Sequence, residues 1–373
     1  MVRDIPQLPT DMDEIMDYVA HEQPVMAKAA RGMDFSRLPL AKATFVKCDF
    51  AGARFQATNL TGAALVGCDL TGAVFTDAAL KETRFVDCDL AGADFAGCDL
   101  YLAQFVASRM PEATFEAASL DRVSLAACDA RNTNFAKAAL QRSSFLDCPI
   151  DGMDVSGASL AGVAVTKADL RSVALEDASI EVALFSEADL SGKDLSGQSW
   201  QKCTFHKARF VGARMTGARL DGSVFVECDF AGADLSSVRA PMACFGKSNL
   251  AGVDLASSNL HMASFFEADL HGAVFNNFNL FSASFRNARA KAAQFEYCDM
   301  RQADLEHADI SAANFAAAGF FNTKLHATLR EGTLLLGSSG SYLDTDQDRQ
   351  IAEVYTPRVV VAHDDASRKA TRR

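Results

Sequence analysis

The stretch CDLAGADFAGCDL, residues 88–100, places a large apolar residue at every fifth position: Leu90, Phe95 and Leu100. A period of five fits neither an amphipathic helix, whose apolar residues recur every three to four positions, nor a strand, whose side chains alternate in twos. A chain that keeps this period must turn repeatedly and form short sides of equal length.

The same period governs most of the chain. From Phe35 to Leu325 every residue whose number is divisible by five is apolar, so 290 residues in steps of five give 58 unbroken steps. A spacing of twenty separates the residue types, with Leu at 40, 60, 80, 100, 120, 140 and 160 and Phe at 35, 55, 75, 95, 115 and 135. We therefore expect four sides per coil, with the strands of successive coils about 4.8 Å apart.

Charged residues give an independent indication of the same coil length. Opposite charges alternate every twenty residues along one column: Lys167, Glu187, Lys207, Glu227, Lys247 and Glu267. On stacked strands opposite charges attract and like charges repel, so this alternation favours neighbouring coils that are twenty residues apart.

Segments such as ADF, CDL, ADL, SNL and ANF, repeated in fives over residues 31–330, resemble the pentapeptide-repeat family. The resemblance implies an all-β solenoid, a right-handed quadrilateral β-helix of about 14 to 15 coils and about 70 Å in length. Because each coil buries its faces only against its neighbours, both ends need covering. We expect an N-terminal helical cap over residues 1–30, and a C-terminal cap with a flexible basic tail over residues 331–373.

Two segments depart from the repeat. Residues 11–23 predict a capped amphipathic helix, because Asp11 and Glu14 have the spacing of a capping box before an apolar face. Residues 190–200 place Lys193 and Gln198 at small inward positions and Trp200 at a large one. Since burial of an unpaired ammonium is costly, we expect an irregularity there: a bulge, a bend or a binding site.

Composition excludes several classes of protein. The chain carries 36 basic and 48 acidic residues, net charge −12, which disfavours direct nucleic-acid binding. We find no signal-peptide pattern and no run of about 18 apolar residues, so we expect no membrane insertion and a cytoplasmic location. Nine cysteines occupy the small inward position, which predicts buried, reduced thiols: 48, 68, 88, 98, 128, 148, 203, 228 and 298.

Site chemistry is sparse in this sequence. The seven histidines share no side of the coil apart from pairs far apart along the axis, so we expect no metal, no cofactor and no catalytic residues. Eighteen aspartates precede a large apolar residue, for example Asp49, Asp69 and Asp89. We favour the interpretation that these side chains form hydrogen bonds to their own turns. The alternative is a ladder of carboxylates that binds cations or imitates DNA.

Outward apolar residues are the candidate binding positions, because contiguous apolar surface often marks a protein interface. One predicted stripe consists of Val46, Val66, Val86, Val106 and Leu146. A second group consists of Met242, Met262, Phe281 and Phe321 on one side, with Phe266 and Phe278 on neighbouring sides. Favourable β packing of valine is the alternative explanation of the first stripe.

We expect a non-catalytic protein-binding scaffold, a rigid rod that docks protein partners of unknown identity, a second copy of the chain among them, through flat β faces. The family resemblance implies two contexts. One is an accessory or effector-loading protein of a bacterial secretion system, including type VI. The alternative is a DNA-mimicking binder of type II topoisomerase (gyrase) that confers fluoroquinolone resistance.

Overall fold

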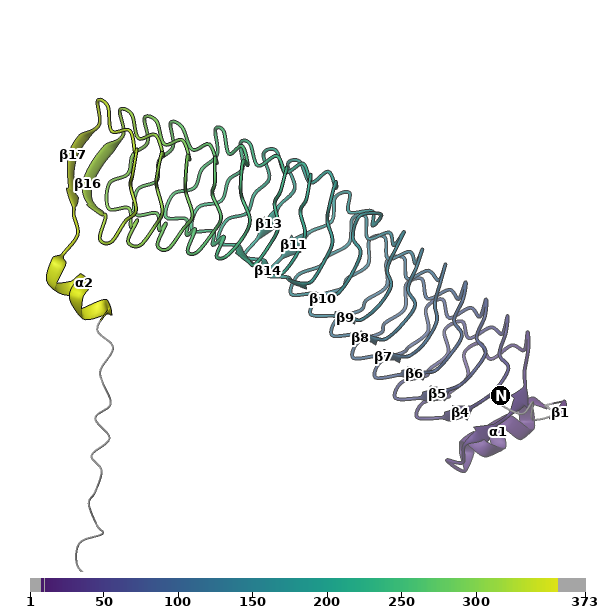
Figure 1. Ribbon diagram of the computed structural model, residues 1–373. Helices are drawn as coiled ribbons and strands as arrows, with labels where there is room; N and C mark the ends of the chain where they lie inside the picture. The colour runs from purple at the N-terminus through teal and green to yellow at the C-terminus, as the bar shows by residue number, and fades with distance from the viewer. Residues whose placement is uncertain (1–7, 10, 355–373) are drawn as a thin grey trace, which may run out of the picture.

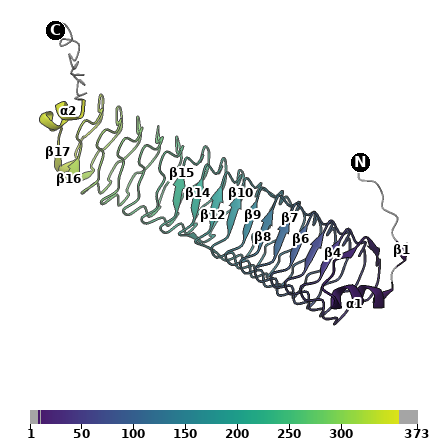
Figure 2. The same cartoon turned by 90° about the horizontal axis from the view of Figure 1, so that it is seen from below.

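The protein is a single parallel β-solenoid of about 16 coils in the computed structural model, which describes residues 8–9 and 11–354. Helix α1 (Met12–Ala20) lies at one end, α2 (Gln347–Val354) lies beside the other end, and the coil axis between them is curved (Figure 1). Seen from below, the strands of one side form a continuous row along the rod (Figure 2).

Successive coils pair residue i with residue i+20. The main sheet contains β2 (Val25–Met26), β4 (Thr44–Val46), β5 (Ala64–Val66), β6 (Arg84–Val86), β7 (Gln104–Val106), β8 (Ser124–Ala126), β9 (Ser144–Leu146), β10 (Ala164–Thr166), β12 (Leu184–Ser186), β14 (Thr204–His206) and β15 (Val224–Val226). Shorter pairs are β1 (Leu8–Pro9) with β3 (Lys28–Ala29), β11 (Ile180–Glu181) with β13 (Trp200–Gln201), and β16 (Gly319–Lys324) with β17 (Ser339–Leu343). Isolated bridges continue the same register on the other sides. The predicted period of twenty is confirmed.

Each five-residue unit contains a turn followed by three extended residues. The second turn residue has a positive φ, as at Gly52 (67°), where glycine is free of strain. The third and fifth residues of each unit, such as Ala53 and Phe55, point inward, and the fourth residue between them points outward. Asp49, at this outward position, accepts a 3.0 Å hydrogen bond on Oδ1 from the Ala51 N–H. This contact recurs along the rod and confirms that the aspartates bond to their own turns.

The interior is a stack of large side chains. Phe75, Phe95 and Phe115 are fully buried, and their ring centroids are 4.7 Å apart with nearly parallel planes. The cysteines at the small inward position are buried, as the sequence predicts, and all ten cysteines are free. Backbone bonds between coils satisfy the polar groups of each side, for example Leu60 N–H to Ala79 O at 2.9 Å.

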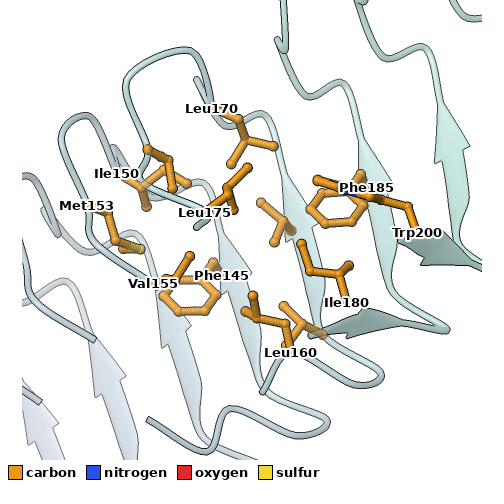
Figure 3. Close-up of a pocket in the computed structure, with 13 residues that line it drawn as sticks. Phe145, Ile150, Met153, Val155, Leu160, Leu170, Leu175, Ile180, Phe185 and Trp200 are labelled. Atoms are coloured by element: carbon orange, nitrogen blue, oxygen red, sulfur yellow. The ribbon is translucent and has the colours of Figure 1, made fainter. Parts of the chain in front are cut away.

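The central coils are packed less completely. Phenylalanine gives way to Val155 and Leu175 in the column that begins at Phe35, and a cavity of about 30 Å³ opens there (Figure 3). Its lining is apolar: Phe145, Ile150, Met153, Val155, Leu160, Val163, Val165, Leu170, Val173, Leu175, Ile180, Phe185 and Trp200. Smaller side chains on an unchanged backbone spacing leave this space.

The backbone ladder is also interrupted in this region. Pro149 has no N–H to donate, and it lies between the bridged pairs Arg109–Asp129 and Asp169–Asp189. Lys193, expected to disturb its coil, extends its Nζ to the carbonyl oxygen of Val173 at 2.5 Å. The register nevertheless continues, since Ile180 pairs with Trp200.

The N-terminal helix is present where the sequence predicts it. Asp11 caps α1 by accepting from the Asp13 N–H at 3.2 Å, and Ile15 is fully buried against the first coil. The reciprocal contact of a capping box is not formed, because Glu14 accepts from Lys28 Nζ at 2.5 Å instead.

Solenoid pairing begins at Leu8, which pairs with Lys28, and continues to Leu343, which is why there are more coils than the 14 or 15 expected. The predicted boundary at residue 330 therefore falls inside this pairing. The predicted basic tail lies outside the described residues.

Candidate protein-binding surfaces

Turn residues of successive coils form straight columns along the rod. The Met242 N–H donates to His261 O at 2.9 Å, the Ser282 N–H donates to Arg301 O at 3.0 Å, and the Gln302 N–H donates to Phe321 O at 2.7 Å. These bonds fix the turns one above another, so any side chains they carry line up parallel to the axis.

The structure brings four of the predicted residues to one corner of the coil, and we call them the Met–Phe stripe: Met242 and Met262 at the second turn position, and Phe281 and Phe321 at the first. Met242, Met262 and Phe321 are 62%, 49% and 52% exposed, and Phe281 is half-buried. The stripe spans five consecutive coils. Four large apolar side chains that gather at one corner form a candidate protein interface.

Neighbouring side chains hold Phe281 in place. The His261 ring stacks on it with centroids 5.9 Å apart, and the Arg301 guanidinium lies 5.7 Å from its centroid on the next coil. Stacking and cation–π contact both favour one orientation of the ring. The centre of the stripe is thus ordered before any partner binds.

The remaining two aromatic residues do not join the stripe. Phe266 is 36% exposed, but its turn lies at the opposite end of the side Ala263–Phe265 from Met262. Phe278 was expected to be exposed, and this is wrong: it is buried at a small inward position and contacts Phe275, with centroids 6.0 Å apart. Residue 278 lies two before Leu280, in the column of small inward residues, so the repeat itself places this side chain inside.

The predicted valine stripe is in register on β4 to β9, pairing Val46 with Val66, Val66 with Val86 and Val86 with Val106. Its first three valines are half-buried, whereas Val106 and Leu146 reach 37% and 38% exposure. Because the valines shield one another along the sheet, this stripe offers less apolar surface per residue than the Met–Phe stripe.

Sequence reasoning missed the apolar character of the C-terminal end. Leu334 and Leu336, expected to help cap the solenoid, lie on the last coil and are 57% and 83% exposed. Leu329, Tyr342 and Leu343 are exposed beside them. Within the described residues nothing covers this end, because α2 docks on the turns beside it.

It also missed a polar cluster at the docking site of α2. His307 and His326 are nineteen residues apart, and this spacing puts them on neighbouring coils in the same turn region, where Glu353 of α2 meets both. Arg349 of α2 donates two bonds to the buried Glu306 carboxylate, at 2.9 and 2.8 Å, and lowers the pKa of that group. The signal was the spacing of nineteen, one short of a full coil.

Family models of known proteins match most of the chain. The pentapeptide repeat region model matches residues 38–115 and 118–195, and the pentapeptide repeats (8 copies) model matches residues 183–217, 213–252, 243–281 and 291–326. This chain belongs to the pentapeptide-repeat family. Membership agrees with the square coil and with the recurring turn aspartates described above.

Solved pentapeptide-repeat structures resemble the chain in fold alone. A trypsin-treated form of QnrB1, a plasmid-mediated fluoroquinolone resistance protein, is 22% identical with a TM-score of 0.46, and the match covers 48% of this chain and 91% of that one. HetL of the cyanobacterium Nostoc sp. strain PCC 7120, involved in heterocyst differentiation regulation, is 16% identical with a TM-score of 0.14, covering 88% and 94%. No curated protein matches the sequence.

Neither of the two helices in the described part of the chain has the length and apolarity that a membrane crossing requires.

Proposed function

We propose that this pentapeptide-repeat protein is a non-catalytic scaffold that binds a protein partner along the Met–Phe stripe. The observation that carries this proposal is the exposure of Met242, Met262 and Phe321 at one corner of the coil within a run of five coils. Burying such side chains releases about 25 cal/mol per Å² of apolar surface, and aromatic and methionine residues are enriched at interfaces.

The spacing of the stripe favours an amphipathic helix as the bound element. Coils rise about 4.8 Å each, and an α-helix rises about 5.4 Å per turn, so a helix laid along the rod meets one coil with each turn. A partner helix with one apolar residue per turn would place these residues between Met242 and Phe321. The acidic net charge of the full chain, −12, favours basic residues on the flanks of that helix.

The experiment uses the full-length protein with a photo-crosslinking residue in place of Met262. We expect one partner to be captured and its crosslinked peptide to lie in a helix. Phe321→Glu should abolish capture, whereas Val66→Lys, a charge placed on the valine stripe, should leave it unchanged. Capture that survives Phe321→Glu but is lost in Val66→Lys would move the docking site to the valine stripe and overturn the assignment.

The alternative, imitation of DNA toward a type II topoisomerase, draws on one observation: Asp49, Asp69 and Asp89 stack directly above one another. Arginines neutralise part of this column, since Arg31 lies 3.1 Å from Asp49 and Arg109 lies 2.7 Å from Asp89. We therefore expect no inhibition or protection of gyrase in a supercoiling assay. Inhibition that is lost when Asp69 is changed to Lys would favour the alternative over the scaffold.

Self-association, if it occurs, is expected at the exposed C-terminal end, where Leu334 and Leu336 would pack against the same residues of a second copy. Sedimentation should then show a dimer for the unaltered chain and a monomer for Leu336→Glu. The resemblance to the family also implies a role as an accessory protein of a bacterial secretion system. This stays a prediction, and the identity of the captured partner tests it.

A further inference from the structure

Helix α2 meets the solenoid at three side chains whose ligand atoms converge. His326 Nε2 lies 3.1 Å and His307 Nε2 lies 3.3 Å from the same oxygen, Oε2 of Glu353. All three atoms are within 4.8 Å of one another. The two histidines come from neighbouring coils and the glutamate from α2, so the cluster joins segments that are distant in the sequence.

The three side chains of the cluster combine one buried group with two groups that solvent can reach. The His326 side chain is only 4% exposed, whereas those of His307 and Glu353 are 29% and 33% exposed. The buried imidazole is fixed by its surroundings, and the other two groups leave a path from solvent. A site with three protein ligands and one open position has this arrangement.

The other oxygen of the glutamate is already occupied. Arg349 Nε donates to Glu353 Oε1 at 2.8 Å, and the same guanidinium bonds to Glu306, which also pairs with Arg286. The two arginines and two glutamates balance in charge. Hydrogen bonding to a ligating carboxylate orients it and leaves Oε2 directed at the two imidazoles.

We propose that His307, His326 and Glu353 form a binding site for a divalent transition metal ion, with Zn²⁺ the best fit. Two imidazoles and one carboxylate are a known zinc ligand set. With metal–ligand bonds of about 2.0–2.1 Å, a tetrahedral site has ligand atoms about 3.3–3.4 Å apart. The two distances to Glu353 Oε2, 3.1 and 3.3 Å, are close to this edge length.

His326 is held in place at its other ring nitrogen. The Asp346 N–H donates to His326 Nδ1 at 3.1 Å, and this contact directs Nε2 at Glu353. An ion bound by the three side chains would tie Glu353 of α2 to the two coils that carry the histidines.

The test is a titration of the full-length, metal-free protein with Zn²⁺, and with Co²⁺ as a visible-absorption probe. We expect one ion per chain and a Co²⁺ spectrum of tetrahedral type. His307→Asn, which retains the contact of α2 with His326, and Glu353→Gln should each weaken binding at least tenfold. His271→Asn, a change at an exposed histidine on a distant turn, is the matched control and should bind like the unaltered chain.

Amide hydrogen exchange gives a second readout that an ordinary ion pair would not move. Zn²⁺ should slow exchange in the last turn of α2, and His307→Asn should remove this effect. The proposal is overturned if no ion binds stoichiometrically, or if His307→Asn and Glu353→Gln bind as the unaltered chain does, which would place the ion at the cysteines or elsewhere.

Discussion

The N-terminal coils and the central coils share a backbone but differ in how they are filled. In the column from Phe35 to Phe135 the rings stack at 4.6–4.9 Å with planes within 9° of parallel. In the next coils of that column, Val155 and Leu175 border a cavity of about 30 Å³. Both regions keep the spacing of twenty without a shift.

The difference shows that coil length and core filling have separate causes. The turns, with their αL residues and aspartate bonds, set twenty residues per coil whatever lies inside. The side chains then determine how tightly coils adhere and whether the stack stays straight. In the coils with the incomplete core, Pro149 and the contact of Lys193 with Val173 interrupt the backbone hydrogen bonds between coils. The Nε1–H of Trp200 is also buried there, with no hydrogen-bond partner among the described residues. Defects of core and backbone thus occur together.

The largest expected effect comes from truncating a stacked ring. Phe95→Ala removes four ring contacts, two stacked and two edge-on, and should cost about 3–5 kcal/mol of unfolding free energy. Leu175→Ala, made beside the existing cavity, should cost about 2 kcal/mol, the low end for leucine, because its neighbours already lack contacts there. Urea unfolding followed by circular dichroism measures both.

Equal costs for the two variants would mean that the central coils are packed as tightly as the N-terminal ones. Repeat proteins can unfold in stages, so the midpoint of each transition is compared along with the fitted free energy.

The coil was predictable from the sequence because its causes are local and repeated. Leu60 and Leu80 lie one above the other because both occupy the last position of a five-residue unit, four units apart. The pattern of turn, small and large residues within one unit is enough to predict this position. The burial of Phe278 follows the same pattern, because residue 278 lies two before Leu280 and twenty before the inward Cys298. The extra coil turns beyond residue 330 were not predictable in this way, because the apolar period is lost at Arg330.

The candidate surfaces were predictable only in part. The Met–Phe stripe followed from counting in twenties, since Met242 and Met262 share a column. The cluster of His307 and His326 did not, because it is completed by Glu353 of α2, whose docking no periodicity describes. Contacts between repeat and non-repeat segments need three-dimensional coordinates.

A smaller effect is expected from filling the cavity. Val155→Ile adds one methylene to the lining and should stabilise the protein by up to about 0.8 kcal/mol. The same change at Val253, a small inward position that is fully packed, should destabilise by about 1–3 kcal/mol through crowding. Thermal unfolding of the two variants compares them directly. Stabilisation at both positions would remove the distinction between the regions.

Lys193 allows a test of the interrupted ladder. Burial lowers its pKa below the usual value for lysine, and its Nζ occupies the Val173 carbonyl that a backbone N–H uses in regular coils. Lys193→Ala should let the Asp194 N–H donate to that carbonyl and slow its hydrogen exchange, with a stability change below about 1 kcal/mol. Lys193→Met keeps the bulk without the charge and should leave the Asp194 amide exchanging as before. Slow exchange of the Asp194 amide in both variants would show that the charge of Lys193, and not its size, prevents the bond from Asp194 N–H to Val173 O.

The smallest expected effect concerns two carboxylates, one in each region. Hydrogen bonds from the Ser36 side chain, the Ser36 N–H and Arg54 lower the pKa of Asp34 to about 2 from 3.8. The Ser196 side chain, Arg214 and the Ser196 N–H lower the pKa of Asp194 to the same value. A lowered pKa stabilises the folded state above pH 3.8, and this contribution is lost as pH falls through about 2.

Asn59 makes the same turn bond without a charge, so Asp34→Asn and Asp194→Asn should keep the turn and lose only the charge-dependent part. Their melting temperatures should lie slightly below that of the unaltered protein at pH 6 and converge with it as pH approaches 2. If the melting temperature converges for Asp34→Asn but not for Asp194→Asn, the incomplete core alters the surface turns of the central coils. If both variants converge, turns and core act independently.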